Sequence, residues 1–190
     1  MTDLLTLIFS CITIISALIF LVLIILLHFF SNKYNPIKNT VSDYAAALPS
    51  KKNFLFVAMP LAGALSTFSL AIAVSISFKT ASAIILFLLL SSICRFFLIF
   101  FPADITGQRS TKKGKTHLLF AIIAFASVAF AAGNFYITAA DKIISQFVII
   151  TAVLLLFGFL PPFKKIFGLL ERIFLLSSIV WLVVIGFEML

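Results

Sequence analysis

Residues 4–30 read LLTLIFSCITIISALIFLVLIILLHFF, and none of these 27 positions holds Asp, Glu, Lys or Arg. A helix that crosses the roughly 30 Å hydrocarbon core of a bilayer needs about 20 predominantly apolar residues. The stretch is therefore long enough to span a membrane with some tilt. It is also longer than the apolar core of a cleaved signal peptide, about 7–15 residues, so we expect it to be retained as a helix.

The rest of the chain has a similar composition. Of the 190 residues, 63% are apolar, 11% are charged and 24 are Phe. A soluble domain carries about 25% charged residues, and at this length too much of its chain faces water to hide so much apolar surface. The composition therefore excludes a soluble fold, a disordered chain and a secreted disulfide scaffold.

Five further apolar stretches are long enough to span a bilayer. The expected fold is all-α: a polytopic membrane protein in which six transmembrane helices form one bundle, a single domain over residues 1–190. The expected spans are 4–30, 54–77, 81–101, 116–137, 141–160 and 167–189.

Basic residues gather in alternate loops between these spans. The first, third and fifth loops hold ten: Lys33, Lys38, Lys51, Lys52, Arg109, Lys112, Lys113, Lys115, Lys164 and Lys165. The second and fourth loops hold only Lys79 and Lys142. Cytoplasmic loops are enriched in Lys and Arg, so the odd loops are predicted to be cytoplasmic and both termini extracytoplasmic, in a plasma (inner) membrane. The net charge of +8 then reflects orientation and contact with anionic membrane lipids, and no nucleic-acid partner is expected.

Small residues predict which helices pack most closely. They are frequent in 54–77 and 116–137, namely Ala58, Ala62, Gly63, Ser66, Ala73, Ala121, Ala124, Ala126, Ala129, Ala131, Ala132 and Gly133. Small side chains let helix backbones approach each other in a membrane, so these two spans are expected at the centre of the bundle. Cys11 and Cys94 lie in different spans at different depths, so no disulfide is expected.

Titratable side chains are concentrated on the predicted cytoplasmic side. They are His28, Asp43, Arg95, Asp104, His117, Glu171 and Arg172. Ionisable groups in a membrane are costly unless they are paired or hydrated, which makes this group a candidate site.

Several of these residues also have structural interpretations. Thr40 and Asp43 fit a capping box that would begin a short helix over 41–48, lying flat at the membrane interface. Asp104 follows Pro102 and fits a turn. Arg95 is placed to extend toward lipid phosphates or to pair with Glu171.

Known catalytic motifs are missing from the sequence. It contains no GxSxG, HExxH or Walker loop, and two histidines are too few for multi-histidine hydrolases or lipid phosphatases. A haem between His28 and His117 is geometrically conceivable, as is a mixed metal site of Asp43, Asp104 and His117. No close ligand spacing supports either, so neither a metal nor a cofactor is expected.

Three blocks occur in a recognisable order: Asn35-Pro36-Ile37-Lys38-Asn39-Thr40-Val41-Ser42-Asp43-Tyr44, then Phe101-Pro102-Ala103-Asp104 leading to Gly114-Lys115-Thr116-His117, then Gly168-Leu169-Leu170-Glu171-Arg172 before Trp181. Their order and spacing resemble the bacterial and archaeal multi-pass family called domain of unknown function 998. The resemblance marks Ser42, Asp43, Pro102, Asp104, His117, Glu171 and Arg172. Ala103 departs from the family pattern, where a Thr is expected after the proline. The family name implies no activity.

Three functions remain open. The first is binding or transport of an anionic lipid headgroup or small anionic metabolite, in a pocket walled by spans 54–77, 81–101, 116–137 and 167–189. Its expected ligand-binding residues are Ser42, Asp43, Arg95, Asp104, His117, Glu171 and Arg172. The second is an intramembrane hydrolase or transferase with His117 as general base and Asp43 or Asp104 orienting it. The third is a non-catalytic subunit whose polar cluster locks the helices and whose Phe-rich surface docks on a protein partner.

Overall fold

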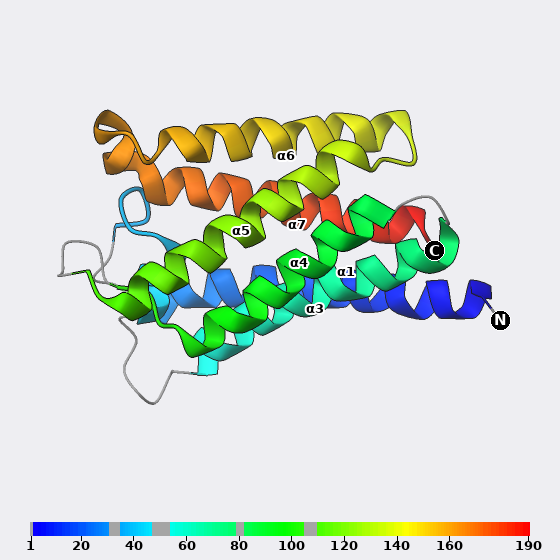
Figure 1. Ribbon diagram of the computed structural model, residues 1–190, viewed down its shortest axis with the longest axis horizontal. Coiled ribbons are helices and arrows are strands. Elements are labelled where there is room, and N and C mark those ends of the chain that lie inside the picture. The colour runs from blue at the N-terminus through cyan, green and yellow to red at the C-terminus, as the bar shows by residue number, and fades with distance from the viewer. Residues whose placement is uncertain (1, 31–34, 47–53, 79–81, 105–109) are drawn as a thin grey trace.

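The computed structural model describes residues 2–30, 35–46, 54–78, 82–104 and 110–190, and every regular element in these ranges is a helix. Six of the helices are long and apolar enough to cross a membrane (Figure 1). The predicted fold class, an all-α polytopic membrane protein, is thus confirmed. Long apolar segments adopt helices in lipid because a helix satisfies its own backbone hydrogen bonds.

The helices lie close to the predicted spans. They are α1 (Thr2–Phe30), α2 (Val41–Ala46), α3 (Phe54–Ser77), α4 (Ser82–Phe97), the 3-10 turn η2 (Leu98–Phe100), α5 (Lys112–Asn134), α6 (Ala139–Phe157), the 3-10 segment η3 (Pro161–Ile166) and α7 (Phe167–Glu188). Helix α5 begins before the predicted residue 116 because Thr111 caps it and accepts a hydrogen bond from Gly114 N. The lysines of its first turn belong to the helix.

The six long helices form a closed ring in which neighbours in sequence pack together. Helix α3 contacts α1 and α4, α5 contacts α4 and α6, and α7 contacts α6 and closes the ring against α1. Buried side chains are most frequent on α3 and α7. The prediction that spans 54–77 and 116–137 form the centre is therefore right for α3 and wrong for α5.

The two ends of the bundle differ in charge. The described parts of the odd-numbered connections lie together at one end, whereas both chain termini lie at the other (Figure 1). The first end carries Lys38, Lys112, Lys113, Lys115, Lys164 and Lys165, and we call it the basic end. Lys33, Lys51, Lys52, Lys79 and Arg109, which also entered the charge count, lie outside the described residues.

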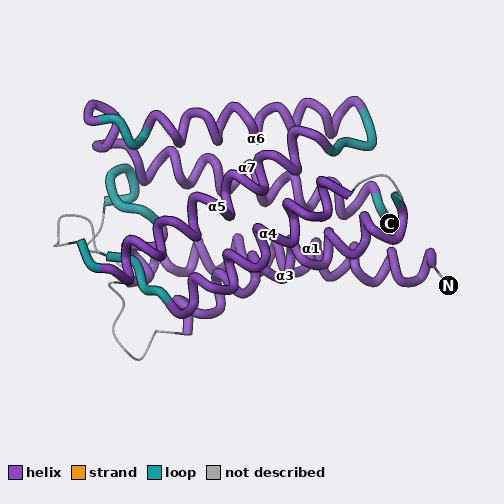
Figure 2. The backbone as a smooth tube through the Cα atoms, in the orientation of Figure 1, coloured by secondary structure: helices purple, strands orange, loops and turns teal. Residues whose placement is uncertain are grey.

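The short helix α2 is buried at the basic end, where Figure 2 shows the connections that join the long helices. The predicted Thr40–Asp43 capping box is confirmed: Asp43 N donates to Thr40 Oγ1 and Thr40 N donates to Asp43 Oδ2, both at 3.0 Å. The prediction that the helix lies flat on the membrane is wrong, because Val41, Asp43, Tyr44 and Ala45 are buried. Tyr44 is only 2% exposed, and its burial raises the pKa of its hydroxyl.

Hydroxyl groups connect the helices within the apolar region. Thr13 and Ser69 join α1 to α3 at 2.9 Å, and Thr151 and Ser177 join α6 to α7 at 2.8 Å. Such bonds stabilise helix pairs where no hydrophobic effect drives them together. Cys11 and Cys94 are both free thiols.

Candidate functional site

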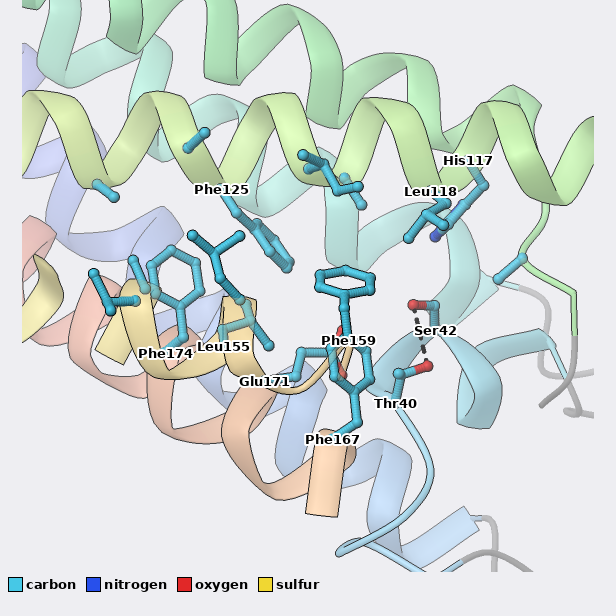
Figure 3. Close-up of a pocket in the computed structure, with 18 of the residues that line it drawn as sticks. Thr40, Ser42, His117, Leu118, Phe125, Leu155, Phe159, Phe167, Glu171 and Phe174 are labelled. Atoms are coloured by element: carbon cyan, nitrogen blue, oxygen red, sulfur yellow. Dashed lines mark hydrogen bonds between the residues drawn. The ribbon is translucent and has the colours of Figure 1, made fainter. Parts of the chain in front are cut away.

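A large cavity of about 770 Å³ lies between α5, α6 and α7 and reaches the basic end of the bundle. Its wall near the basic end is polar, formed by Thr40, Ser42, Asp43, Asp104, Ser110, Lys115, His117 and Glu171. We call this part the polar end. The remainder is lined almost entirely by Ala, Phe, Leu, Ile and Val, and we call it the apolar slot. Figure 3 shows both parts, with Phe125 and Phe174 on one side of the view and His117 and Ser42 on the other.

The apolar slot exists because one face of α5 carries small side chains. Ala121, Ala126, Ala129 and Gly133 line the slot and leave space that larger residues would fill. Helices α5 and α6 lie close together at their short connection and diverge toward the basic end (Figure 1). The sequence indicated that the small residues of α5 allow close helix packing. In the structure, several of them line the cavity instead.

His117 presents one ring nitrogen to the cavity. Its Nδ1 lies 2.7 Å from the carbonyl oxygen of Phe101. A carbonyl only accepts, so Nδ1 carries a proton and the neutral ring has its lone pair on Nε2. Figure 3 shows the ring directed toward Ser42. His117 therefore offers a hydrogen-bond acceptor, or a base, at the polar end.

Asp104 stabilises the connection that leads into α5. Its Oδ2 accepts from Thr111 N and its Oδ1 accepts from Thr111 Oγ1, both at 2.7 Å. These two bonds hold the pKa of the Asp104 carboxyl below its ordinary value. A Cβ at Gly114 would lie 2.0 Å from Asp104 Oδ2, so only glycine allows this carboxylate to sit so close to the first turn of α5. Asp104 therefore holds Thr111, the residue that caps the next helix.

Glu171 links α7 to the first turn of α2. Its Oε2 accepts a hydrogen bond of 2.6 Å from Val41 N, a backbone donor that α2 itself leaves unpaired. The side chain is buried and lines the cavity beside Ser42. Asp43 lines the same wall while it completes the capping box with Thr40. Glu171 and Asp43 thus combine a structural bond with a place at the polar end.

Arg95 lines a second, small cavity of about 50 Å³. Ser42, His117, Ala121, Phe125 and Glu171 line both cavities, so the small one adjoins the polar end. Arg95 is 3% exposed, and within the described ranges its only side-chain hydrogen bond runs from Nε to Ser91 Oγ at 3.4 Å. Of the two alternatives that the sequence left open for Arg95, the ion pair with Glu171 is not found among the described residues. The four spans predicted to wall the ligand pocket, α3, α4, α5 and α7, all line the small cavity, together with α1 and α2. The large cavity is lined by α6 and not by α3 or α4.

Arg172 lies outside both of these cavities. Its Nη1 donates to the carbonyl oxygens of Pro36, Asn39 and Gly168, and its guanidinium lies 5.0 Å from the ring centroid of Tyr44. These contacts hold the connection between α1 and α2 against α7. Gly168 is required there, because a Cβ would lie 2.2 Å from Asn39 O.

His28 is fully engaged in the same structural contacts. Its Nδ1 lies 2.7 Å from Ile24 O, and its Nε2 accepts from Arg172 Nε at 2.9 Å. Neither nitrogen is available to the haem iron that the sequence left conceivable. The described part of the chain contains no group of three or more His, Cys, Asp or Glu side chains placed to hold a metal ion.

The structure therefore divides the seven predicted site residues. Ser42, Asp43, Asp104, His117 and Glu171 meet at the polar end, Arg95 adjoins it through the small cavity, and Arg172 lines neither cavity. The sequence did not single out the aromatic wall of the slot, formed by Phe125, Phe130, Phe159, Phe167 and Phe174. With 24 Phe residues in the chain, composition alone carries no signal for these five.

Comparison with known proteins gives one match. The family model described as protein of unknown function (DUF998) matches residues 14–188, which is far more than half of the chain. No curated protein and no solved structure matches the chain. The blocks that carried the resemblance in the sequence lie inside the matched range.

Proposed function

Because the chain belongs to the DUF998 family, whose description names no activity, we propose a function from the site itself: the protein binds a membrane lipid in its large cavity. The lipid headgroup occupies the polar end and an acyl chain occupies the apolar slot. One observation carries this proposal, namely that a single cavity of about 770 Å³ is polar at one end and apolar along the rest. Ligand sites are mostly apolar concave pockets with a few polar groups that set orientation.

The shape of the slot supports a ligand that enters from the bilayer. Many side chains that line it also belong to the exposed apolar surface of α5 and α6, including Ile122, Phe130, Val153 and Leu156. In a membrane that surface faces acyl chains, so a lipid reaches the slot without crossing water. A small water-soluble metabolite gains nothing from such a wall.

A pure scaffold role explains only part of the polar cluster. Arg172, His28 and Asp104 are used in structural hydrogen bonds, as a helix-locking function requires. His117 Nε2 and the terminal nitrogens of Arg95 have no protein hydrogen-bond partner among the described residues. Groups left in this state beside a cavity favour a bound ligand over a purely structural cluster.

A photoreactive lipid tests the proposal. A phospholipid with a diazirine in its acyl chain, added to purified protein in detergent, should label α5 between residues 118 and 134, and α6 with the turn that follows it between residues 149 and 159. Excess unlabelled lipid should compete with this labelling, because the site is single and saturable. Labelling spread evenly over all six long helices, and unaffected by competitor, would contradict lipid binding in the cavity.

The His117 tautomer favours hydrolysis as a second candidate function. With Nδ1 bound to Phe101 O, the free Nε2 can accept a proton from a water molecule as that water attacks an ester of the bound lipid. The water oxygen forms the new bond to the acyl carbon, the ester bond breaks, and the leaving alcohol receives the proton. Release of a free fatty acid or a lyso-lipid by wild-type protein, absent for His117→Asn, would support this activity. Intact lipid after prolonged incubation with wild-type protein would exclude it for the lipid tested.

A further inference from the structure

The small cavity beside the polar end is lined by a buried cation, Arg95, that forms no ion pair within the described ranges. Arg95 lies on α4, and its guanidinium carbon is 5.4 Å from the ring centroid of Phe20 and 5.9 Å from that of Phe125. In the described part of the chain, no carboxylate forms an ion pair with it. Buried ionised groups in proteins are normally paired, so the structure lacks the partner that this arginine requires.

The packing around Arg95 leaves its terminal nitrogens room on one side. A Cβ at Gly63 would lie 2.6 Å from Arg95 Nη1, so α3 approaches the guanidinium with bare backbone. On the other side lies the small cavity, to which Ser42, His117 and Glu171 contribute polar atoms. A guanidinium presents a planar fork of donors that matches the oxygens of a carboxylate or phosphate.

The size of the small cavity limits what can enter it. A cavity needs about 10–15 Å³ to hold one water-sized group, so about 50 Å³ accommodates roughly three to five such groups. This is the size of a terminal phosphate. The larger head of a phosphodiester lipid, with a further alcohol attached, does not fit there.

We propose that Arg95 binds a terminal phosphate carried by the lipid in the large cavity, with Ser42 and His117 completing the subsite. This inference rests on the proposed lipid site and names its ligand class: a lipid phosphomonoester. At pH values close to its second pKa of about 6, a phosphomonoester is partly protonated. The P–OH group of the protonated form can donate a hydrogen bond to His117 Nε2 or to Glu171. The remaining phosphate oxygens accept from Arg95. The subsite thus offers one strong donor, the Arg95 guanidinium, and two acceptors, His117 Nε2 and the Glu171 carboxyl group, which together match a phosphomonoester.

Three ligands separate the contribution of the phosphate group to binding from that of the acyl chains. Delipidated full-length protein in a non-ionic detergent is titrated with phosphatidic acid, with diacylglycerol of the same acyl chains, and with inorganic phosphate. Binding is measured as the shift in thermal midpoint and by native mass spectrometry. Phosphatidic acid should bind at least about tenfold more tightly than diacylglycerol, a difference of about 1.4 kcal/mol.

The variant Arg95→Gln should bring the affinity ratio of phosphatidic acid to diacylglycerol down toward one. The matched control is Lys112→Gln, which removes an exposed cation of the basic end that lines neither cavity, and it should leave the ratio unchanged. If Arg95→Gln fails to fold, Gly63→Ala is used instead. Its new methyl group displaces the guanidinium while keeping its charge, and it should lower the same ratio.

Each outcome separates this inference from the proposed function. A ratio near one in wild type, or a ratio unaffected at Arg95 and Gly63, would overturn the phosphate subsite while diacylglycerol binding still supports the lipid cavity. No binding of either lipid would reject the lipid cavity itself. An Arg95-dependent stabilisation by inorganic phosphate equal to that by phosphatidic acid would overturn the lipid as the source of the phosphate.

Discussion

His117 combines a structural and a chemical role in one ring, because its two nitrogens have different surroundings. Nδ1 donates to Phe101 O and thereby fixes the ring relative to η2, while Nε2 faces the polar end. The sequence placed His117 in the candidate site through its position at the start of a span. It did not reveal the tautomer, which depends on a carbonyl group sixteen residues earlier in the chain.

Replacing His117 with Asn tests which role matters more. The amide keeps polarity but has no basic nitrogen and reaches less far, so the bound lipid should be lost. Stability should change little, by about 1 kcal/mol for one imperfect hydrogen bond. Thermal midpoint and co-purified lipid are measured together. The control is Thr116→Ala, at a half-buried position of α5 that lines neither cavity. If the variant loses most of its stability and the wild-type protein never retains a lipid, His117 has only a structural role between the helices.

Asp104 should make stability depend on pH in the acidic range. Its pKa in the folded protein is lowered by the Thr111 bonds, so the carboxylate stays charged where the unfolded chain begins to bind protons. The resulting stability is fully present above the ordinary carboxyl pKa, about 4, and is lost as the pH falls through the lowered value.

The measurement compares thermal midpoints of wild type and Asp104→Asn across that range. The advantage of the wild type should be constant near neutral pH and shrink as the pH falls below about 4. A difference that does not change on acidification would show that the carboxylate charge of Asp104 contributes nothing to holding Thr111, the cap of α5.

Sequence patterns predicted single residues well where the interaction is local. The two residues of the predicted capping box, Thr40 and Asp43, are three positions apart in the sequence, and the structure confirms their hydrogen bonds. Long-range partners were not predictable: Glu171 bonds Val41 N across 130 positions, and Arg172 bonds His28 across 144. No sequence rule relates positions so far apart, because the fold alone brings them together.

At the scale of the element, α2 is a short helix that is stabilised at its N-terminal end. Six residues are too few for a helix to be stable alone, so its capping box and the Glu171 bond to its first turn carry much of its stability. The sequence predicted the helix but placed it on the membrane surface, because its tertiary contacts with α7 were unknown.

Two matched capping variants separate stability from binding. Thr40 caps α2 beside the cavity, and Thr138 caps α6 through an equivalent capping box at the opposite end of the bundle. Thr40→Ala and Thr138→Ala should each cost about 0.5–2 kcal/mol, seen as a lower thermal midpoint. Only Thr40→Ala should also weaken lipid binding, because Thr40 and Ser42 line the polar end. Equal losses of binding in both variants would mean that α2 has no special part in the site.

At the scale of the whole molecule, hydropathy was sufficient to predict six spans, since each must cover the same bilayer thickness. Their arrangement was less predictable. Small residues indicated close packing at α5, yet several of them line the cavity, because a small side chain allows either a near neighbour or an empty space.

Orientation in the membrane remains a prediction of the charge bias. In a background without Cys11 and Cys94, Lys112→Cys should react with an impermeant maleimide only after cells are permeabilised. Lys142→Cys, at the opposite end, should react with the maleimide in intact cells. A reporter fused after Leu190 should behave as extracytoplasmic. Reaction of Lys112→Cys from outside would reverse the arrangement and place the polar end away from the cytoplasm.

Filling the apolar slot tests the lipid site most directly. Ala129 lines the slot, so Ala129→Phe occupies the space proposed for the acyl chain, whereas Ala83→Phe makes the same change at an exposed position of α4 outside the cavities described. Native mass spectrometry of purified protein should show one bound lipid in wild type and in Ala83→Phe, and little or none in Ala129→Phe. Equal lipid occupancy in all three proteins would contradict binding in this cavity.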